Sequence, residues 1–81
     1  MTVATMTGIA AEAIEFEVDN DSLIAGQALR DVEFPKGGVV GTIIRGDEII
    51  LPRGDDVLHP GDDVIVFAVP SAIPAVEALF D

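Results

Sequence analysis

The stretch 39–69 most constrains how this chain can fold, because it holds three apolar runs separated by short acidic turns that contain glycine. Runs of this length, bounded by Gly, Pro and Asp, are typical of β-strands. Gly46-Asp47 separates the first two runs, and glycine at the first central position favours a type II′ hairpin. We therefore predict that Val39–Arg45 pairs with Glu48–Leu51, and that Asp63–Val69 is the last strand.

The segment before this stretch predicts a strand followed by a short helix. Apolar and acidic residues alternate from Ala13 to Val18, as in a strand with one face on a core and one face in water. Asp21 or Ser22 then offers a side-chain oxygen that can cap free N–H groups. We predict a helix from about Leu23 to Leu29.

The segment after the stretch predicts one closing helix. Ser71 is the expected N-cap of a helix that runs to about Phe80, and Pro74 falls in its first turn, where a missing N–H costs nothing. The predicted order is β-α-β-β-β-α. It describes a small α+β domain with a mainly antiparallel sheet and helices packed on one face. We assign residues 13–81 to this domain and residues 1–12 to an N-terminal lead-in or tail.

The charge of the chain excludes several classes of partner. Fifteen acidic residues against four basic ones give a formal net charge of −11. Nucleic acids and anionic membrane surfaces both require Lys and Arg, so neither is expected to bind. No apolar run reaches the ~20 residues that span a bilayer, and no signal peptide is recognised, so we expect a cytoplasmic protein without membrane insertion.

The apolar content of the central strands predicts self-association. Two short helices can cover only one face of a sheet, whereas the three central runs present apolar groups on both faces. A domain of 81 residues buries only about 60% of its unfolded surface, which leaves little stability to spare. The simplest cover for the second face is another copy of the chain, so we expect a homodimer.

The residues that could carry catalysis do not form a known arrangement. His59 is the only histidine, and it lacks partners at any known metal-ligand spacing; a calcium or sodium site made from carboxylates alone remains an alternative. Ser22 and Ser71 are interpreted as helix caps, so no triad is available. Arg-Gly-Asp occurs at 45–47 and 53–55, where it is interpreted as turn chemistry. We expect no enzyme and no metal site.

Arg45 leaves two alternatives open. It is one of four cations in a strongly acidic chain, and it ends an apolar strand. Near a two-fold axis, two copies of Arg45 would flank an interface and could hold an anionic ligand by charge-assisted hydrogen bonds. The second alternative is pairing with a local carboxylate such as Glu48 or Asp47.

Four segments, in this order and spacing, resemble the TrkA C-terminal domain, also called RCK-C, of potassium-transport regulators. They are Ala28–Asp31 with Phe34–Gly37, then Val40–Asp47, Pro60–Phe67 and Val76–Phe80. The resemblance covers about residues 13–80, and the predicted element order agrees with the fold of that family.

The resemblance implies a regulatory, non-catalytic domain. Such domains dimerise in the cytosol and attach to a membrane-embedded potassium transporter or channel subunit, which places them at the inner face of the membrane. NAD belongs to a Rossmann-like lobe that this sequence does not include, so no NAD site is expected here. Cyclic di-AMP, which some members bind across the dimer interface, or a cation is the candidate ligand. The interface positions implied are those of the first central hairpin: Val40, Ile43, Ile44, Arg45 and Ile49.

The resulting hypothesis is a cytosolic ligand-sensing and dimerisation domain of a Trk- or Ktr-type regulator of potassium uptake or of a potassium channel. The alternative is an RCK-C domain of another ion transporter or antiporter that acts as a dimerisation module without a ligand. A lipoyl or biotinyl carrier domain would need a lysine at a hairpin tip. The only lysine, Lys36, lies beside Pro35 and two glycines.

Overall fold

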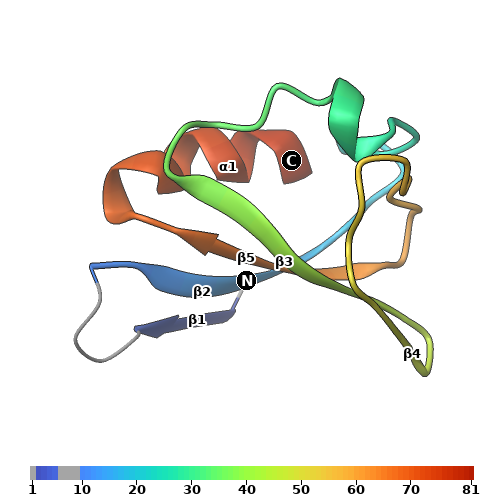
Figure 1. Ribbon diagram of the computed structural model, residues 1–81, viewed down its shortest axis with the longest axis horizontal. Helices are drawn as coiled ribbons and strands as arrows, with labels where there is room; N and C mark the ends of the chain where they lie inside the picture. The colour runs from blue at the N-terminus through green and yellow to red at the C-terminus, as the bar shows by residue number, and fades with distance from the viewer. Residues whose placement is uncertain (1, 6–9) are drawn as a thin grey trace.

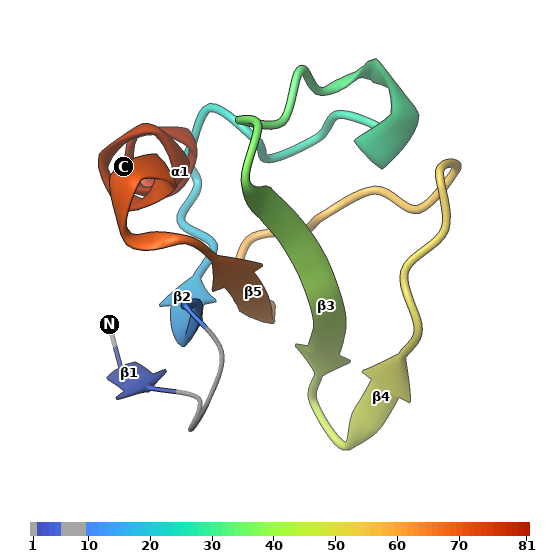
Figure 2. The same cartoon turned by 60° about the vertical axis from the view of Figure 1, so that its left-hand side comes forward.

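The computed structural model describes residues 2–5 and 10–81, which form an antiparallel sheet with one C-terminal α-helix. The strand order across the sheet is β1-β2-β5-β3-β4, as Figure 2 shows. The strands are β1 (Thr2–Thr5), β2 (Glu12–Glu17), β3 (Gly38–Arg45), β4 (Glu48–Ile50) and β5 (Asp63–Ala68). The predicted α+β class and its mainly antiparallel sheet are confirmed.

The helix and the long connections lie on one side of this sheet (Figure 1). Helix α1 (Ile73–Phe80) covers it there, preceded by the 3₁₀ turn η2 (Pro70–Ala72). The long connections 18–37 and 51–62 lie on the same side, and the first contains the 3₁₀ turn η1 (Leu29–Asp31). We call the side that α1 and the connections cover the covered face, and the opposite side the open face.

The hydrophobic core lies between the covered face and α1. The aromatic rings of Phe16 on β2 and Phe80 on α1 stack there, with centroids 4.4 Å apart and planes within 4°. The buried apolar side chains are Ile14, Phe16, Val18, Ile24, Ile43, Leu58, Val64, Val66, Ala68, Ala72, Val76 and Phe80. Both connections contribute to this set, so they form part of the core.

A β-bulge in β3 sets which of its side chains reach the core. Val40 pairs with Val66 and Ile43 pairs with Val64, and both face the core although they are three residues apart. An unbroken strand would place them on opposite faces; the register shift between Val40 and Thr42 brings them to the same one. The strand prediction for this segment is confirmed, starting one residue earlier than expected.

The β3–β4 hairpin has the turn that the sequence predicts. Arg45 pairs with Glu48, so Gly46 and Asp47 form a two-residue loop. Gly46 has a φ of +61°, and no residue other than glycine has a positive φ among the described residues. A positive φ at the first central position alone is the mark of a type II′ turn.

The helix predicted over Leu23–Leu29 does not form, and this prediction is wrong. The backbone N–H of Ile24 donates instead to the carbonyl of Leu79, and that of Gly26 to the carbonyl of Leu58. Gly26 has a φ of +82°, which no α-helix contains. Contacts with distant segments therefore replace the hydrogen bonds that a local helix would have made.

The two serines predicted as helix N-caps have other roles. Ser71 lies within η2, and the N-cap of α1 is Ala72, which makes no side-chain cap bond; Pro74 is in the first turn as predicted. The Ser22 hydroxyl is buried and donates to the carbonyl of Phe80 at 2.9 Å. Ser22 therefore fastens the connection 18–37 to the end of α1, where carbonyls lack helical partners.

The N-terminal lead-in also differs from a simple tail. Thr2–Thr5 forms β1, which pairs antiparallel with β2, and Glu12 already belongs to β2. Residue 1 and residues 6–9 of the predicted lead-in lie outside the described residues. The described part of this segment is an edge strand of the sheet.

Candidate functional site

The open face of the sheet carries apolar side chains on β3, β4 and β5, and acidic side chains on β2 and at the start of β5. Opposed pairs fix its members, because residues that face each other in the register share one face. Val39 and Ile49 are 58% and 71% exposed there. The side chains on this face are Ala13, Glu15 and Glu17 of β2, Asp63, Ile65 and Phe67 of β5, Val39, Thr42 and Ile44 of β3, and Ile49 of β4.

The structure divides the five predicted interface residues among three environments. Ile43 is fully buried and Val40 packs against the core, so both belong to the covered face. Ile44 and Ile49 oppose each other on the open face. Arg45 makes an ion pair. The five residues therefore do not form one surface, and their contact with a ligand stays a prediction.

Arg45 pairs with a carboxylate, but the partner is Asp62, seventeen positions away, and neither Glu48 nor Asp47. Its Nε donates to Oδ1 of Asp62 at 2.9 Å, and its Nη2 donates to Oδ2 at 2.8 Å. The same Nη2 donates to the carbonyl of Val57 at 3.0 Å. This bidentate arrangement ties the end of β3 to the connection 51–62.

Asp62 is a buried charge whose oxygens are satisfied. Its side chain is 2% exposed, whereas that of Arg45 is 35% exposed. Hydrogen bonds from Arg45, with a further one from the backbone N–H of His59 at 2.9 Å, hold the pKa of the Asp62 carboxyl below its usual value against the opposing effect of burial. The pKa of Arg45 is raised, chiefly by its hydrogen bond to Asp62. Asp62 is therefore buried although it belongs to one of the acidic turns of the sequence.

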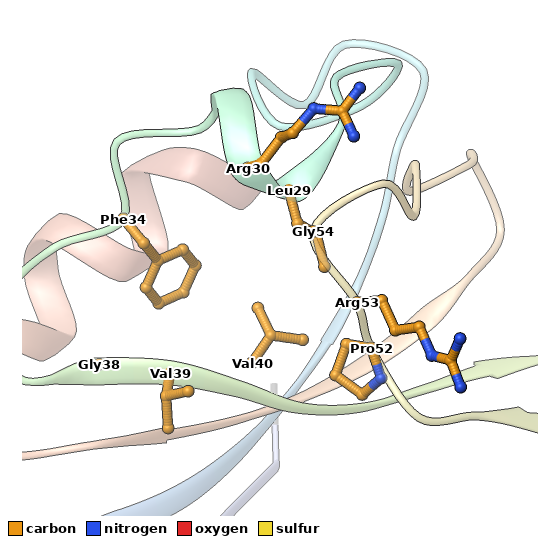
Figure 3. Close-up of a pocket in the computed structure, with 9 residues that line it drawn as sticks. All are labelled: Leu29, Arg30, Phe34, Gly38, Val39, Val40, Pro52, Arg53 and Gly54. Atoms are coloured by element: carbon orange, nitrogen blue, oxygen red, sulfur yellow. The ribbon is translucent and has the colours of Figure 1, made fainter.

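A pocket of about 280 Å³ lies between the two connections and the start of β3. Figure 3 shows the Phe34 ring and the Val40 side chain facing each other across it, while Val39 points to the opposite side of the strand. Arg30 and Arg53 extend outward at its rim (Figure 3). The pocket is lined by Leu29, Arg30, Phe34, Gly38, Val39, Val40, Pro52, Arg53 and Gly54.

Main-chain hydrogen bonds hold the two walls of this pocket together. The N–H of Arg30 donates to the carbonyl of Gly54 at 2.8 Å, and the N–H of Leu29 donates to that of Asp56 at 2.9 Å. A Cβ on Gly54 would come within 3.3 Å of the Cβ of Arg30, so a larger residue would crowd this contact. Two arginines from distant segments are thereby placed on either side of one opening.

Of the residues that line this pocket, sequence reasoning named only Val40 as a candidate site residue and missed the two arginines. Arg30 and Arg53 are two of the four basic residues in the chain, which is a signal that could have drawn attention to them. Nothing in their local spacing indicated that they come together, because they lie on separate connections.

Residues 2–5 and 10–81 give little support for a metal site or a membrane-spanning segment. These residues include no group of three or more His, Cys, Asp or Glu side chains arranged to hold a metal ion. Their helices include none with the length and apolar character needed to cross a bilayer. His59 lies in the connection 51–62, where its backbone supports Asp62.

Comparison with known proteins assigns the fold to a class of domain. Residues 13–81 match the TrkA-C domain family. A solved structure described as an RCK domain with cda superposes with a TM-score of 0.71 and 28% identity, covering 85% of this chain and 97% of that one. The chain therefore belongs to the TrkA-C domain family, as its sequence resemblance predicted.

Curated relatives extend this assignment. Trk system potassium uptake protein TrkA homolog 2 of Methanosarcina mazei is 42% identical over 78 residues, which is 96% of this chain and 17% of that protein. The TrkA homolog of Archaeoglobus fulgidus is 34% identical over 80 residues, covering 99% of this chain and 18% of that protein. The chain spans less than a fifth of the length of these relatives.

Proposed function

We propose that this chain is a ligand-sensing and dimerising domain of a Trk-type regulator of potassium transport. Its family assignment and the similarity to Trk system potassium uptake proteins support the transport role. In this proposal the domain acts at the cytoplasmic face of the membrane through a transporter partner. It carries no catalytic step of its own.

The pocket between Arg30 and Arg53 is the observation that carries the ligand-sensing part. In a chain with a formal net charge of −11, two of four basic residues stand at one opening. Both are exposed, so their guanidinium groups are free to donate to an anion at the rim. The Phe34 ring and the apolar side chains inside suit a planar base. An anionic nucleotide such as cyclic di-AMP combines these two features.

The size of the pocket connects ligand binding with dimerisation. About 280 Å³ lies near the lower limit for a small-molecule site, so one pocket holds half of a cyclic dinucleotide and not the whole. A two-fold symmetric ligand would therefore occupy one pocket from each of two copies.

The β3–β4 hairpin supports self-association independently of the ligand. Ile49 and Leu51 are 71% and 76% exposed, and β4 is an edge strand whose outer hydrogen-bonding groups have no strand partner among the described residues. Burying two such side chains per copy favours a dimer. Ligand binding would then change the relative orientation of the two copies, and the attached parts of the regulator would pass this change to the transporter.

Calorimetric titration with cyclic di-AMP tests the ligand. The Arg30→Ala and Arg53→Ala variants are each expected to weaken binding about 10-fold or more, because each removes a charge-assisted hydrogen bond. Lys36→Ala is the matched control, since it removes one positive charge outside the pocket. Equal weakening in all three variants would show a general charge effect and contradict a site at this pocket.

Sedimentation of the ligand-free chain tests dimerisation separately. The dimer fraction should fall between 0.1 M and 0.01 M salt, where the Debye length grows from about 10 Å to about 30 Å and repulsion between acidic copies increases. Ile49→Asp should abolish the dimer. A dimer without cyclic di-AMP binding would favour the alternative of a dimerisation module of another ion transporter, without a ligand.

A further inference from the structure

Strands β2 and β5 form a part of the open face that does not belong to the β3–β4 hairpin. Along this part, opposed pairs run from apolar to acidic: Ala13 faces Phe67, Glu15 faces Ile65, and Glu17 faces Asp63. We call these six residues the β2–β5 ledge. The apolar and acidic ends are four residues apart on each strand, which is about 13 Å.

The acidic end of the ledge lacks compensating charge. Glu17 and Asp63 lie directly opposite each other on neighbouring antiparallel strands, where like charges are destabilising. Within the described residues the open face carries no Lys or Arg, because Arg30 and Arg53 stand at the pocket, Arg45 pairs with Asp62, and Lys36 lies in the connection 18–37. A cation supplied from outside would relieve this repulsion.

The apolar end of the ledge is a flat platform. At the β-bulge, a Cβ on Gly41 would lie 2.3 Å from Cε2 of Phe67, so the Phe67 ring lies directly over the bare backbone of β3. Phe67 nevertheless stays 37% exposed. The bulge thus leaves an aromatic surface available beside the carboxylates.

We propose that the β2–β5 ledge docks a protein segment that presents an apolar side chain and a Lys or Arg about 13 Å apart. The apolar side chain packs on Phe67 and Ile65, and the cation lies between Glu17 and Asp63. The positive charge of this segment complements the carboxylates of Glu17 and Asp63, which favours it over other occupants. A second copy packed open face to open face would bring only apolar and acidic groups to the ledge, and an anionic membrane would be repelled.

This inference is independent of the proposed ligand. The ledge and the pocket lie on opposite faces of the sheet, and Val39 and Val40 point to the two sides (Figure 3). Variants of the pocket arginines should therefore leave ledge binding unchanged, whether or not the pocket binds a nucleotide.

Nuclear magnetic resonance titration of the isotope-labelled chain tests the proposal. The probe is a synthetic helical peptide with leucines at one end and lysines at the other. Two control peptides replace the lysines with glutamate or the leucines with glycine. Binding of the first peptide should shift the amides of β2 and β5, and both control peptides should bind about 10-fold or more weakly.

Charge variants locate the site. Glu17→Lys combined with Asp63→Lys should weaken binding about 10-fold or more, and the milder Glu17→Gln with Asp63→Asn should weaken it in the same direction. Asp21→Lys with Glu33→Lys makes the same change of net charge on exposed positions of the connection 18–37, and should have the smaller effect. Retained amide dispersion confirms folding in each variant.

Three results would overturn the proposal. Equal weakening by the ledge and control charge variants would show non-specific attraction to an acidic protein. Shifts confined to other elements would place the peptide elsewhere. If raising the concentration of the chain alone shifts the ledge amides, a second copy occupies the ledge.

Discussion

The two faces of the sheet carry different kinds of side chain, although the same strands form both. The covered face carries the fully buried side chains of Ile43, Val64 and Val66, and above it lie the Arg45–Asp62 pair and the pocket. The open face carries exposed apolar groups and three carboxylates, Glu15, Glu17 and Asp63. Alternation along each strand therefore separates the buried side chains of one face from the exposed side chains of the other.

The basic residues sharpen this difference. All four cations of the sequence belong to the covered side, to its connections or to the end of β3, and none lies among the open-face residues. An anionic ligand and a cationic partner would thus be drawn to opposite sides of the same small domain. Substitutions that are matched between the faces can test this separation.

The largest expected difference is between two isoleucines of the hairpin. Ile43→Ala should lower the free energy of unfolding by about 2–5 kcal/mol, because it leaves a cavity in the core. Ile49→Ala removes the same atoms from a side chain that is 71% exposed. It should change the free energy of unfolding by about 0.5 kcal/mol or less. Urea unfolding of both variants at a concentration where the chain is monomeric measures this. Similar losses of unfolding free energy in the two variants would contradict the separation of buried and exposed side chains between the two faces.

The next largest effect on stability is expected from removal of the Arg45 side chain. Arg45→Ala leaves the Asp62 carboxylate buried without its two guanidinium hydrogen bonds, and should cost about 2–4 kcal/mol. Lys36→Ala is the control, because Lys36 is exposed. Thermal and urea unfolding of both variants should separate them; an Arg45→Ala variant as stable as Lys36→Ala would show that water satisfies Asp62.

The same pair predicts a pH dependence. The pKa of Asp62 is lowered in the folded state, so its contribution is complete above the unfolded pKa of about 3.9 and is lost as the pH falls through the lower folded pKa. The difference in unfolding free energy between the wild type and Asp62→Asn should therefore be constant from pH 5 to pH 7 and shrink below about pH 4. A difference that does not change with pH would contradict the charged role.

The smallest effect concerns the β-bulge. Gly41→Ala should cost about 1–2 kcal/mol, because the new Cβ displaces the Phe67 ring from its position over β3. Phe67→Ala in the same chain should remove most of this penalty, since the clash disappears. A double-variant cycle by urea unfolding measures the coupling. If the costs of the two single variants add in the double variant, glycine at position 41 is required by the backbone conformation and not by the contact with Phe67.

Local patterns predicted the strands well and the connections poorly. The β3–β4 hairpin follows from a glycine turn between two apolar runs, and alternation in Ala13–Val18 predicts β2 to within one residue at each end. In contrast, Leu23–Leu29 has an N-cap candidate and apolar spacing but no helix. Its backbone bonds go to Leu58 and Leu79, and no window of local sequence contains those partners.

In the candidate sites, too, the sequence predicted what local patterns set and missed what depends on contacts between distant segments. The apolar excess of the central strands predicted a second apolar face, and the structure has exposed apolar side chains there. The partner of Arg45 and the pocket depend on residues far apart in sequence, such as Arg45 with Asp62 and Arg30 with Arg53. Leu58 lies among polar turn residues in the sequence, yet it is fully buried, because the connection 51–62 folds back onto the core.

The position of β5 has a consequence for how the chain acquires its fold. It is the last strand in sequence but lies between β2 and β3 in the sheet, and its partners in β2 are about fifty residues earlier. During synthesis only the β1–β2 and β3–β4 pairings can form before Asp63–Ala68 leaves the ribosome. Non-local pairing of this kind slows folding, because the sheet cannot be completed until β5 joins the β1–β2 and β3–β4 pairs.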